Sequence, residues 1–241
     1  PVELGSGVNL YGYYMFHGGV NPRGGPWEET TASGGYNDVP RRDYDFQAPL
    51  GAFGQQRAVL GKLRMVHLFL HAFGAQLAPM PVRRPARVPA GADDLRAPRW
   101  AVRSAGDSGF LFFDNHVRHY RMPPWRKVRF QVRLPGRTLV LPSAPVDIPA
   151  DAYFIWPLDL DLDGAMLRYA TAQPVTRLQV NGAAVYVFRA VPGIAAEWAV
   201  DAATVSDILS EAGRVVRSGP RGIAAGAEVL VRVEDVRPGA Y

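Results

Sequence analysis

Carboxylate pairs are the residues whose chemistry would be most specific in this chain. Two carboxylates about 5 to 5.5 Å apart serve as acid/base and nucleophile in retaining glycoside hydrolysis. Glu28 and Glu29 are adjacent in a stretch rich in Gly and Pro, and adjacent side chains seldom converge on one bond. Asp43 and Asp45 would share one face of an extended segment. The spacing of these residues alone predicts no complete acid/base pair.

Histidine ligands for a metal ion are also few. His67 and His71 are four residues apart, a spacing that places two metal ligands on one face of a helix. No third ligand accompanies them, and they flank an apolar stripe, so we expect core or surface histidines. The chain has no cysteine, which excludes disulfides, thiolate zinc sites and cysteine nucleophiles.

A cluster of aromatic residues in the second half allows two interpretations. Such side chains can form a platform on which a sugar stacks, or they can fill the core of a β-sandwich. We favour the core, because aromatic residues on strands are more often buried. The residues concerned are Trp125, Tyr153, Phe154, Trp156 and Trp198.

Three aspartates alternate before a glycine, at Asp159, Asp161, Asp163 and Gly164. A calcium loop needs more oxygen ligands and a closing glutamate. Alternation is typical of a strand. We therefore expect a polar strand face that leads into a turn.

The elements of the first 77 residues resemble one βα unit. Residues 8–16 are an almost continuous apolar and aromatic run bounded by glycine, which predicts a strand buried on both faces. Residues 17–49 are rich in Gly, Pro, Thr, Ser and Asn, and loops of such length are usually functional. Residues 55–73 repeat apolar positions at spacings of three and four, which predicts an amphipathic helix that Gly74 would end.

Residues 78–98 contain five prolines among Arg and Ala, which predicts an extended linker and a domain boundary. Short strands follow, with tight turns at Pro135-Gly136 and Asn181-Gly182, and Asn-Gly is a strong hairpin signal. This pattern indicates an antiparallel sandwich. One short helix is expected within residues 200–213. The predicted strands are 100–104, 109–114, 127–134, 137–141, 152–156, 167–172, 176–180, 185–189 and 228–233.

Composition narrows the function classes. The chain has 241 residues and a formal charge of +5. The excess lies in residues 81–140, which hold 13 of the 27 basic residues and 4 of the 22 acidic ones. Most of these bases are arginines in predicted strands or in the Pro-rich segment, and no nucleic-acid-binding motif accompanies them, so we expect no nucleic-acid partner. No apolar run reaches the roughly 18 residues that a membrane span needs, and the first residues are not typical of a signal peptide.

Two segments near the start carry a resemblance to a known family. They are residues 12–22, Gly-Tyr-Tyr-Met-Phe-His-Gly-Gly-Val-Asn-Pro, and residues 44–50, Tyr-Asp-Phe-Gln-Ala-Pro-Leu. They resemble the last strand and following loop of the barrel in glycoside hydrolase family 35 β-galactosidases. Residues 109–116, 153–157, 169–174 and 191–194 show a weaker resemblance, to the β domain that follows the barrel in this family.

The resemblance implies an α/β plus all-β fold: the last βα unit of a (β/α)8 barrel followed by an antiparallel β-sandwich domain. Residues 1–77 would be the C-terminal end of the glycosidase barrel, residues 78–98 a Pro/Arg-rich linker, and residues 99–241 the β-sandwich domain. The catalytic glutamates of the family would precede Pro1, in a missing N-terminal barrel of the same polypeptide. The chain would then have no catalytic residue of its own and be inactive alone.

The resemblance also implies a carbohydrate substrate, a β-galactoside with a terminal β-linked galactose, and no cofactor. The implied substrate-binding residues are Phe46, Tyr44 and His17. Phe46 stands where the family signature has a tyrosine, so an aromatic wall remains without its hydroxyl. His17 would contact a sugar hydroxyl or a catalytic carboxylate, or would only hold the glycine turn that follows. Asp45 is a non-catalytic residue of that signature, which argues against the pair with Asp43.

Further departures from the family are Gln47, where the signature has Asp, and Val20, where Thr is usual; they weaken the case for strict galactose specificity. The alternative is a non-catalytic carbohydrate-binding or structural β-sandwich protein, or a pseudoenzyme. The compartment stays open, an extracytoplasmic one included, because any signal peptide would lie in the missing part. We expect residues 1–75 to be disordered or to aggregate alone, and residues 99–241 to fold.

Overall fold

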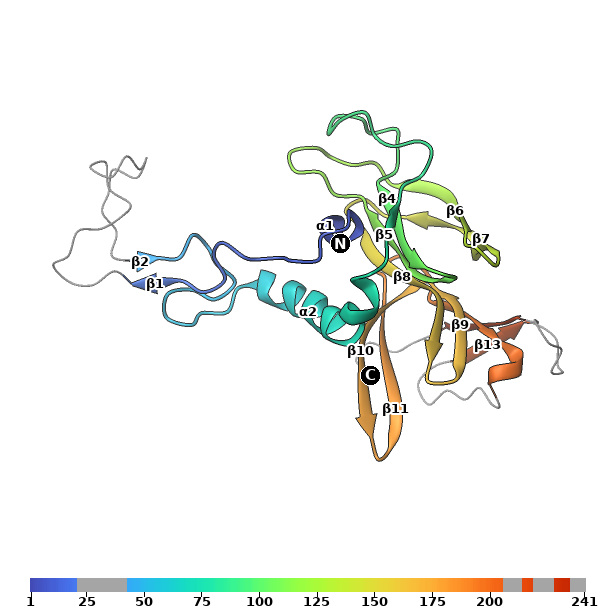
Figure 1. Ribbon diagram of the computed structural model, residues 1–241. Helices are drawn as coiled ribbons and strands as arrows, with labels where there is room; N and C mark the ends of the chain where they lie inside the picture. The colour runs from blue at the N-terminus through green and yellow to red at the C-terminus, as the bar shows by residue number, and fades with distance from the viewer. Residues whose placement is uncertain (21–42, 206–213, 219–227, 235–241) are drawn as a thin grey trace. The chain divides into compact units, whose positions relative to one another are not determined.

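The computed structural model describes residues 1–20, 43–205, 214–218 and 228–234 (Figure 1). The chain divides into two compact units, which are described separately. The loop unit is Leu10–Leu68, and the sheet unit is Pro1–Asn9 with Phe69–Tyr241. Helix α2 (Ala58–Leu77) begins in the loop unit and ends in the sheet unit. No described helix is long and apolar enough to cross a membrane.

An antiparallel sheet of eight strands forms the centre of the sheet unit, in the order β13-β14-β12-β9-β8-β5-β4-β3. Consecutive strands such as β4 and β5 pair directly, as short connections favour. The strands are β3 (Val82–Arg83), β4 (Trp100–Ala105), β5 (Ser108–Asp114), β8 (Tyr153–Leu162), β9 (Ala165–Ala170), β12 (Glu197–Asp201), β13 (Arg214–Ser218) and β14 (Glu228–Glu234).

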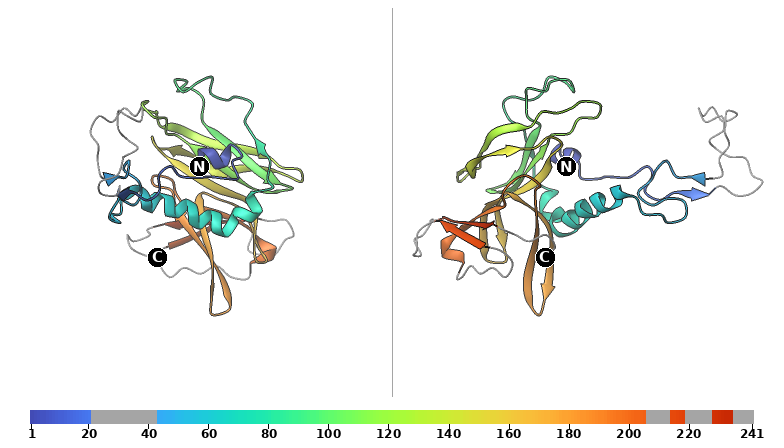
Figure 2. Two further views of the ribbon diagram at one scale, coloured as in Figure 1. Left: turned by 60° about the vertical axis from the view of Figure 1, so that its left-hand side comes forward. Right: turned by 180° about the vertical axis from the view of Figure 1, so that it is seen from behind.

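Two hairpins complete the strands of this unit. One joins β6 (Trp125–Arg133) to β7 (Thr138–Ile148). The other joins β10 (Ala172–Val180) to β11 (Ala183–Ala190) and extends away from the large sheet in both views of Figure 2. Asn181 and Gly182 have φ of 50° and 83°, the positive values that a type I′ turn requires. The predicted Asn-Gly hairpin is thus confirmed.

Alternating residues of β5 supply the cores on both faces of the sheet. Leu111 and Phe113 point to one face, where residues of β6 and β7 such as Phe130 pack over them. Phe110 and Phe112 point to the opposite face. The core of the first face also contains Val102, Val132, Leu139, Leu141, Ile148, Phe154, Trp156, Leu158 and Tyr169.

The second face of the sheet is covered by the end of α2 and by α1 (Val2–Gly5). The rings of Phe69 and Phe73 lie 5.2 and 6.0 Å from the ring of Phe110. Gly5 packs on Phe112 so closely that a Cβ there would lie 2.8 Å from the Phe112 Cβ. The sheet is therefore packed on both faces at β5.

A single arginine ties these pieces together. Arg103 of β4 is 1% exposed. Its Nε donates to the Met80 carbonyl at 3.0 Å, and its Nη1 donates to the Leu4 carbonyl at 3.1 Å. Its Nη2 donates to the Leu77 carbonyl at 3.0 Å and to Asn9 Oδ1 at 2.8 Å. The buried charge is thus solvated by main-chain dipoles and an amide.

Most predicted strands beyond residue 99 are confirmed, and the described residues are mostly antiparallel sheet with few helices, consistent with a β-sandwich. The largest extensions are at β7, predicted as 137–141, and β8, predicted as 152–156. The sequence reading did not find β12 or β13. In place of a helix over 200–213, a single 3-10 turn covers Ala202–Thr204, and residues 206–213 lie outside the described residues.

Two predictions about the first hundred residues are wrong in detail. Residues 8–16 form no strand; no strand among the described residues pairs with their backbone groups, and a strand needs that pairing. The predicted helix 55–73 runs instead over Ala58–Leu77, and Gly74 lies inside it. Residues 78–98, predicted as a linker, include β3 and the buried side chains of Met80 and Ala97.

Candidate functional site

The candidate site is the segment of the loop unit around residues 16–20 and 43–57. Two short strands, β1 (Gly19–Val20) and β2 (Asp43–Tyr44), pair antiparallel, with Gly19 opposite Tyr44. They bring the two ends of the long predicted loop together. The part between them, including Glu28 and Glu29, lies outside the described residues.

Main-chain hydrogen bonds join the Phe16–Gly18 backbone to Leu50. The Gly18 amide donates to the Leu50 carbonyl at 2.8 Å, and the Leu50 amide donates to the Phe16 carbonyl at 3.0 Å. His17 lies between these contacts and forms a parallel bridge with Leu50. Its Nδ1 contacts the Gly18 carbonyl. Through this contact His17 holds the glycine turn.

Gly18 is required where it stands. A Cβ on this residue would lie 2.4 Å from the Cβ of Asp45 and 2.7 Å from the amide nitrogen of Ala52. Any larger residue would push the Asp45 loop away from the His17 backbone. The glycine after His17 thus permits the close approach of two chain segments, a use typical of glycine.

Asp45 and Arg57 hold the loop shut. Arg57 Nη2 donates to Asp45 Oδ2 at 2.9 Å, and Arg57 Nη1 donates to the Ala48 carbonyl at 2.6 Å. The Gln47 amide donates to Asp45 Oδ1 at 2.9 Å. These hydrogen bonds, with that from Arg57 first, hold the pKa of the Asp45 carboxyl below its usual range. Asp45 therefore stays ionised as a structural acceptor.

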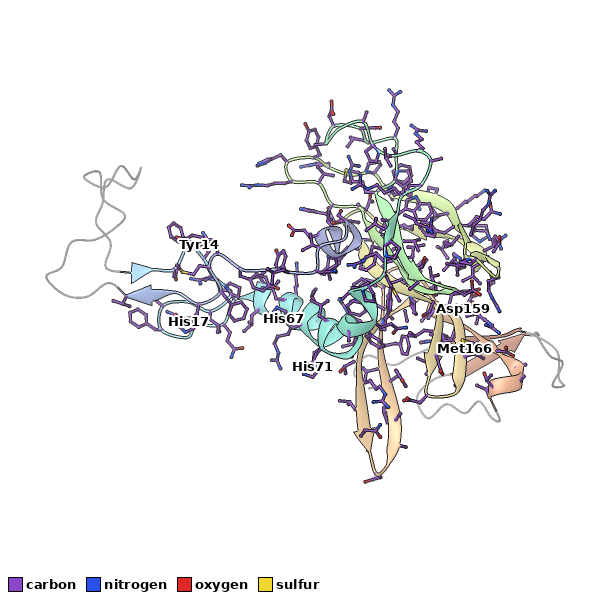
Figure 3. All side chains as sticks on the ribbon, viewed as in Figure 1. Tyr14, His17, His67, His71, Asp159 and Met166 are labelled. Carbon is purple, nitrogen blue, oxygen red and sulfur yellow. The ribbon has the colours of Figure 1, made fainter. Side chains whose placement is uncertain are left out.

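The same loop presents an aromatic ring to solvent. Phe46 has φ of 42° and Gln47 has φ of 58°, an uncommon left-handed conformation that the Asp45 contacts support. The Phe46 side chain is 53% exposed, and that of Tyr14 is 82% exposed. Their ring centroids are 6.2 Å apart. The loop unit therefore carries a largely exposed aromatic pair; Tyr14 and His17 are labelled in Figure 3.

His67 takes part in this region through a contact with the phenol of Tyr13. Tyr13 Oη and His67 Nε2 are 2.7 Å apart, and burial raises the pKa of the Tyr13 hydroxyl. Figure 3 shows His67 and His71 along α2. Within the described ranges, no group of three or more His, Cys, Asp or Glu side chains could hold a metal ion.

In the sheet unit, three of the aromatic residues considered as a sugar platform belong to the core. Phe154 and Trp156 are fully buried and stack at 4.0 Å between centroids. Trp125 packs against the same core. The favoured interpretation is confirmed for these three.

The alternating aspartates also take structural roles. Asp159 is buried between Arg168 Nη1 at 2.7 Å and Arg137 Nε at 2.9 Å. Asp163 accepts from Arg177 Nε at 2.8 Å at the turn. This is the polar strand and turn that the sequence predicts, except that Asp159 is buried instead of solvated.

The structure brings the three sequence-predicted residues into one unit through their backbones. Tyr44 pairs with β1, His17 directly precedes that strand, and Phe46 lies two residues beyond Tyr44. The sequence reading missed two residues that shape this region, Tyr14 and Arg57. Tyr14 belongs to the apolar run that predicts a buried strand, so its exposure was not expected. No local sequence pattern predicts a salt bridge between Asp45 and Arg57.

No family model matches this chain, and no protein of established function matches its sequence.

Proposed function

We propose that this chain is part of a β-galactosidase-like retaining glycoside hydrolase that cleaves terminal β-linked galactose from carbohydrates. In this proposal residues 1–77 complete a (β/α)8 barrel, and residues 99–241 form a β-sandwich domain that buttresses it. The two catalytic glutamates belong to the preceding part of the same polypeptide. This chain contributes the wall of the pocket that carries Phe46, Tyr44 and His17.

The observation that carries the proposal is the aromatic pair of Tyr14 and Phe46, whose side chains are largely exposed. Two aromatic rings 6.2 Å apart and 82% and 53% exposed present an apolar surface to whatever lies beside them. An apolar ring face suits the apolar face of a pyranose. The loop that carries Phe46 is held by the Asp45–Arg57 ion pair at 2.9 Å, so the ring is preorganised.

The environment of Asp45 is consistent with a structural role for this carboxylate in the proposed enzyme. Arg57 and the Gln47 amide donate to its two oxygens, and its pKa is lowered. A general acid needs a raised pKa, near the working pH. The lowered pKa argues against Asp45 as the general acid, and in this proposal Asp45 positions the loop while the catalytic pair comes from elsewhere in the enzyme.

The test uses the complete polypeptide that contains this chain, assayed on 4-nitrophenyl β-D-galactopyranoside. We expect Phe46→Ala to raise KM about tenfold, the equivalent of about 1.4 kcal/mol of lost sugar contact. Phe46→Tyr restores the hydroxyl of the family signature and should raise the preference for galactose over glucose substrates. Phe53→Ala is the matched control, since Phe53 is an exposed aromatic of the same unit at 72%.

Three outcomes would contradict the proposal. One is a polypeptide in which no glutamate-bearing barrel precedes Pro1. Another is an intact protein that hydrolyses no β-galactoside. The third is a KM that responds equally to Phe46→Ala and Phe53→Ala, which would place the aromatic pair outside the pocket. Either of the first two would favour the non-catalytic carbohydrate-binding or structural alternative.

A further inference from the structure

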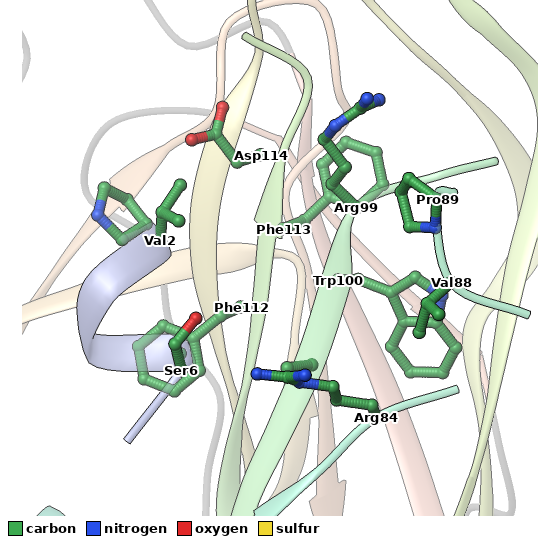
Figure 4. Close-up of a pocket in the computed structure, with 13 residues that line it drawn as sticks. Val2, Ser6, Arg84, Val88, Pro89, Arg99, Trp100, Phe112, Phe113 and Asp114 are labelled. Atoms are coloured by element: carbon green, nitrogen blue, oxygen red, sulfur yellow. The ribbon is translucent and has the colours of Figure 1, made fainter. Parts of the chain in front are cut away.

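The sheet unit contains a pocket that the proposed function does not use. It has a volume of about 300 Å³ and lies beside α1, the first residues of β4, the last residues of β5, and the chain around residues 84–89. We name it the Trp100 pocket, after the indole that forms one wall (Figure 4). The volume is at the lower end of the range for small-molecule sites, which suits a single sugar ring better than an oligosaccharide.

The walls of the Trp100 pocket are apolar and partly rigid. Trp100 lies opposite Val2 in Figure 4, with Val88 beside the indole. The Trp100 ring also packs edge-on against Phe130 of the sandwich core, at 5.2 Å between centroids. The core thus fixes the orientation of the indole, and a ligand in the pocket meets a preorganised aromatic surface.

Donor groups reach the pocket from two arginines. Arg99 Nη2 is anchored to the carbonyls of Gly91 and Ala92 at 3.0 and 3.1 Å. Its Nη1 is buried and has no hydrogen-bond partner among the described residues. Arg84 projects its guanidinium between Ser6 and Trp100 in Figure 4. Arg99 is thus held in place by its hydrogen bonds, whereas Arg84 is exposed.

Acceptor groups line the same pocket. Asp114 Oδ1 accepts from the His116 amide at 2.7 Å, and the structure shows no partner for Oδ2 among the described residues. Burial raises the pKa of this carboxyl, because the charged form loses hydration. The Ser6 hydroxyl also lines the pocket and can accept or donate.

We propose that the Trp100 pocket binds one neutral pyranose ring, stacked on Trp100 and hydrogen-bonded through its hydroxyls to Arg84, Arg99 and Asp114. The mixture of donors and acceptors carries this choice. A phosphate, sulfate or carboxylate only accepts hydrogen bonds, and it would place its charge against that of Asp114. A sugar hydroxyl both donates and accepts, so it can satisfy the whole set. The site belongs to the sheet unit alone and does not rest on the proposed glycosidase function.

Titration calorimetry on the 241-residue chain tests this directly. The probes are methyl β-D-galactopyranoside and methyl β-D-glucopyranoside, with galacturonate and inorganic phosphate as the charged comparisons. We expect the neutral glycosides to bind with Kd on the order of 1 mM and the two anions to bind more weakly.

Two variants and one control locate the binding. Trp100→Ala removes the stacking surface and should weaken glycoside binding at least about tenfold. Arg84→Gln should weaken it about fivefold to tenfold, the effect of one charge-assisted hydrogen bond. Because Arg84 is exposed, this variant keeps its fold even if Trp100→Ala does not. Arg83→Gln is the matched control: it removes the neighbouring exposed arginine, which does not line the pocket, and should leave Kd unchanged.

The proposal is overturned if neither glycoside binds at its highest soluble concentration. It is also overturned if galacturonate or phosphate binds more tightly than both glycosides, which would make this an anion site. Glycoside binding that is equally strong in Arg84→Gln, Arg83→Gln and the parent chain would place the sugar elsewhere and reject the pocket as well.

Discussion

The guanidinium of Arg103 donates a hydrogen bond of 3.0 Å to the carbonyl of Leu77, the last residue of α2. Carbonyls at the end of a helix lack partners within the helix, and the helix dipole favours a cation there. Arg103 comes from β4, so this contact fixes the helix end to the sheet. It also donates hydrogen bonds to Leu4, Met80 and Asn9. One side chain on β4 thus holds the N-terminal segment and the end of α2 in place.

Replacing Arg103 should therefore cost more stability than any exposed charge does. We expect Arg103→Gln to lower the free energy of unfolding by about 3 to 5 kcal/mol, because several buried carbonyls lose their donor. Arg103→Lys should cost less, since it keeps the charge but provides only three donors from a single nitrogen. Urea unfolding followed by tryptophan fluorescence measures both. Arg133→Gln, at an exposed position of β6, is the control. An equal loss of unfolding free energy in this variant would contradict the stabilising role of Arg103.

The end of α2 covers one face of the sheet, so we expect the stability of a fragment to depend on whether it includes that helix end. The sequence predicts that residues 99–241 fold alone, but that fragment lacks Phe69, Phe73 and Leu77, which cover the Phe110 face. We expect a chain of residues 69–241 to be more stable than one of residues 99–241 by at least about 4 kcal/mol, from buried apolar area alone.

Chemical denaturation of the two fragments provides the comparison. A second measurement is binding of the dye ANS, which should be stronger for the shorter fragment because Phe110 loses the cover of Phe69 and Phe73. Equal denaturation midpoints and no dye binding would show that the helix end contributes little to the sandwich.

The sandwich strands were predictable because their cause is local. Alternation, Asn181-Gly182 and Pro135-Gly136 act over a few residues, and the structure follows them closely. The contacts of Arg103 join positions up to 99 apart in the sequence, and no periodicity encodes them. In the candidate site, the glycine turn and the aromatic loop were visible in the sequence, whereas the Asp45–Arg57 pair was not. Residues 8–16 read as a strand because the apolar pattern reports what could be buried, not whether a neighbouring strand is there.

The Asp45–Arg57 ion pair predicts a pH dependence confined to the loop unit. Hydrogen bonds from Arg57 and Gln47 lower the folded-state pKa of Asp45 from its usual 3.8. A depressed carboxyl pKa contributes stability above the unfolded-state pKa and loses it as the pH falls through the folded-state value. Asp45→Asn should therefore weaken the loop at neutral pH and have little effect in acid.

Amide hydrogen exchange by NMR reports on this loop directly. The Ala48 amide donates to the Asp45 carbonyl at 2.6 Å, so its protection follows the loop. We expect Asp45→Asn and Arg57→Gln each to reduce Ala48 protection near pH 7, and the difference from the parent chain to shrink toward about pH 3. Asp147→Asn, which breaks an exposed ion pair of β6 and β7, should not change it. Equal protection of the Ala48 amide in the parent chain and in all three variants would contradict a role of the Asp45–Arg57 ion pair in holding the loop.

Asp114 predicts the opposite dependence. Burial raises its folded-state pKa above the usual 3.8, so the folded protein binds a proton more readily than the unfolded one. Stability therefore falls as the pH rises from the unfolded-state value through the folded-state value. Asp114→Asn cannot ionise, and its amide oxygen can still accept from the His116 amide. The variant should match the parent chain near pH 3 and gain stability over it as the pH rises to about 7. Urea midpoints across that range measure the difference, and a variant that is less stable than the parent at neutral pH would show that the ionised carboxylate stabilises the fold.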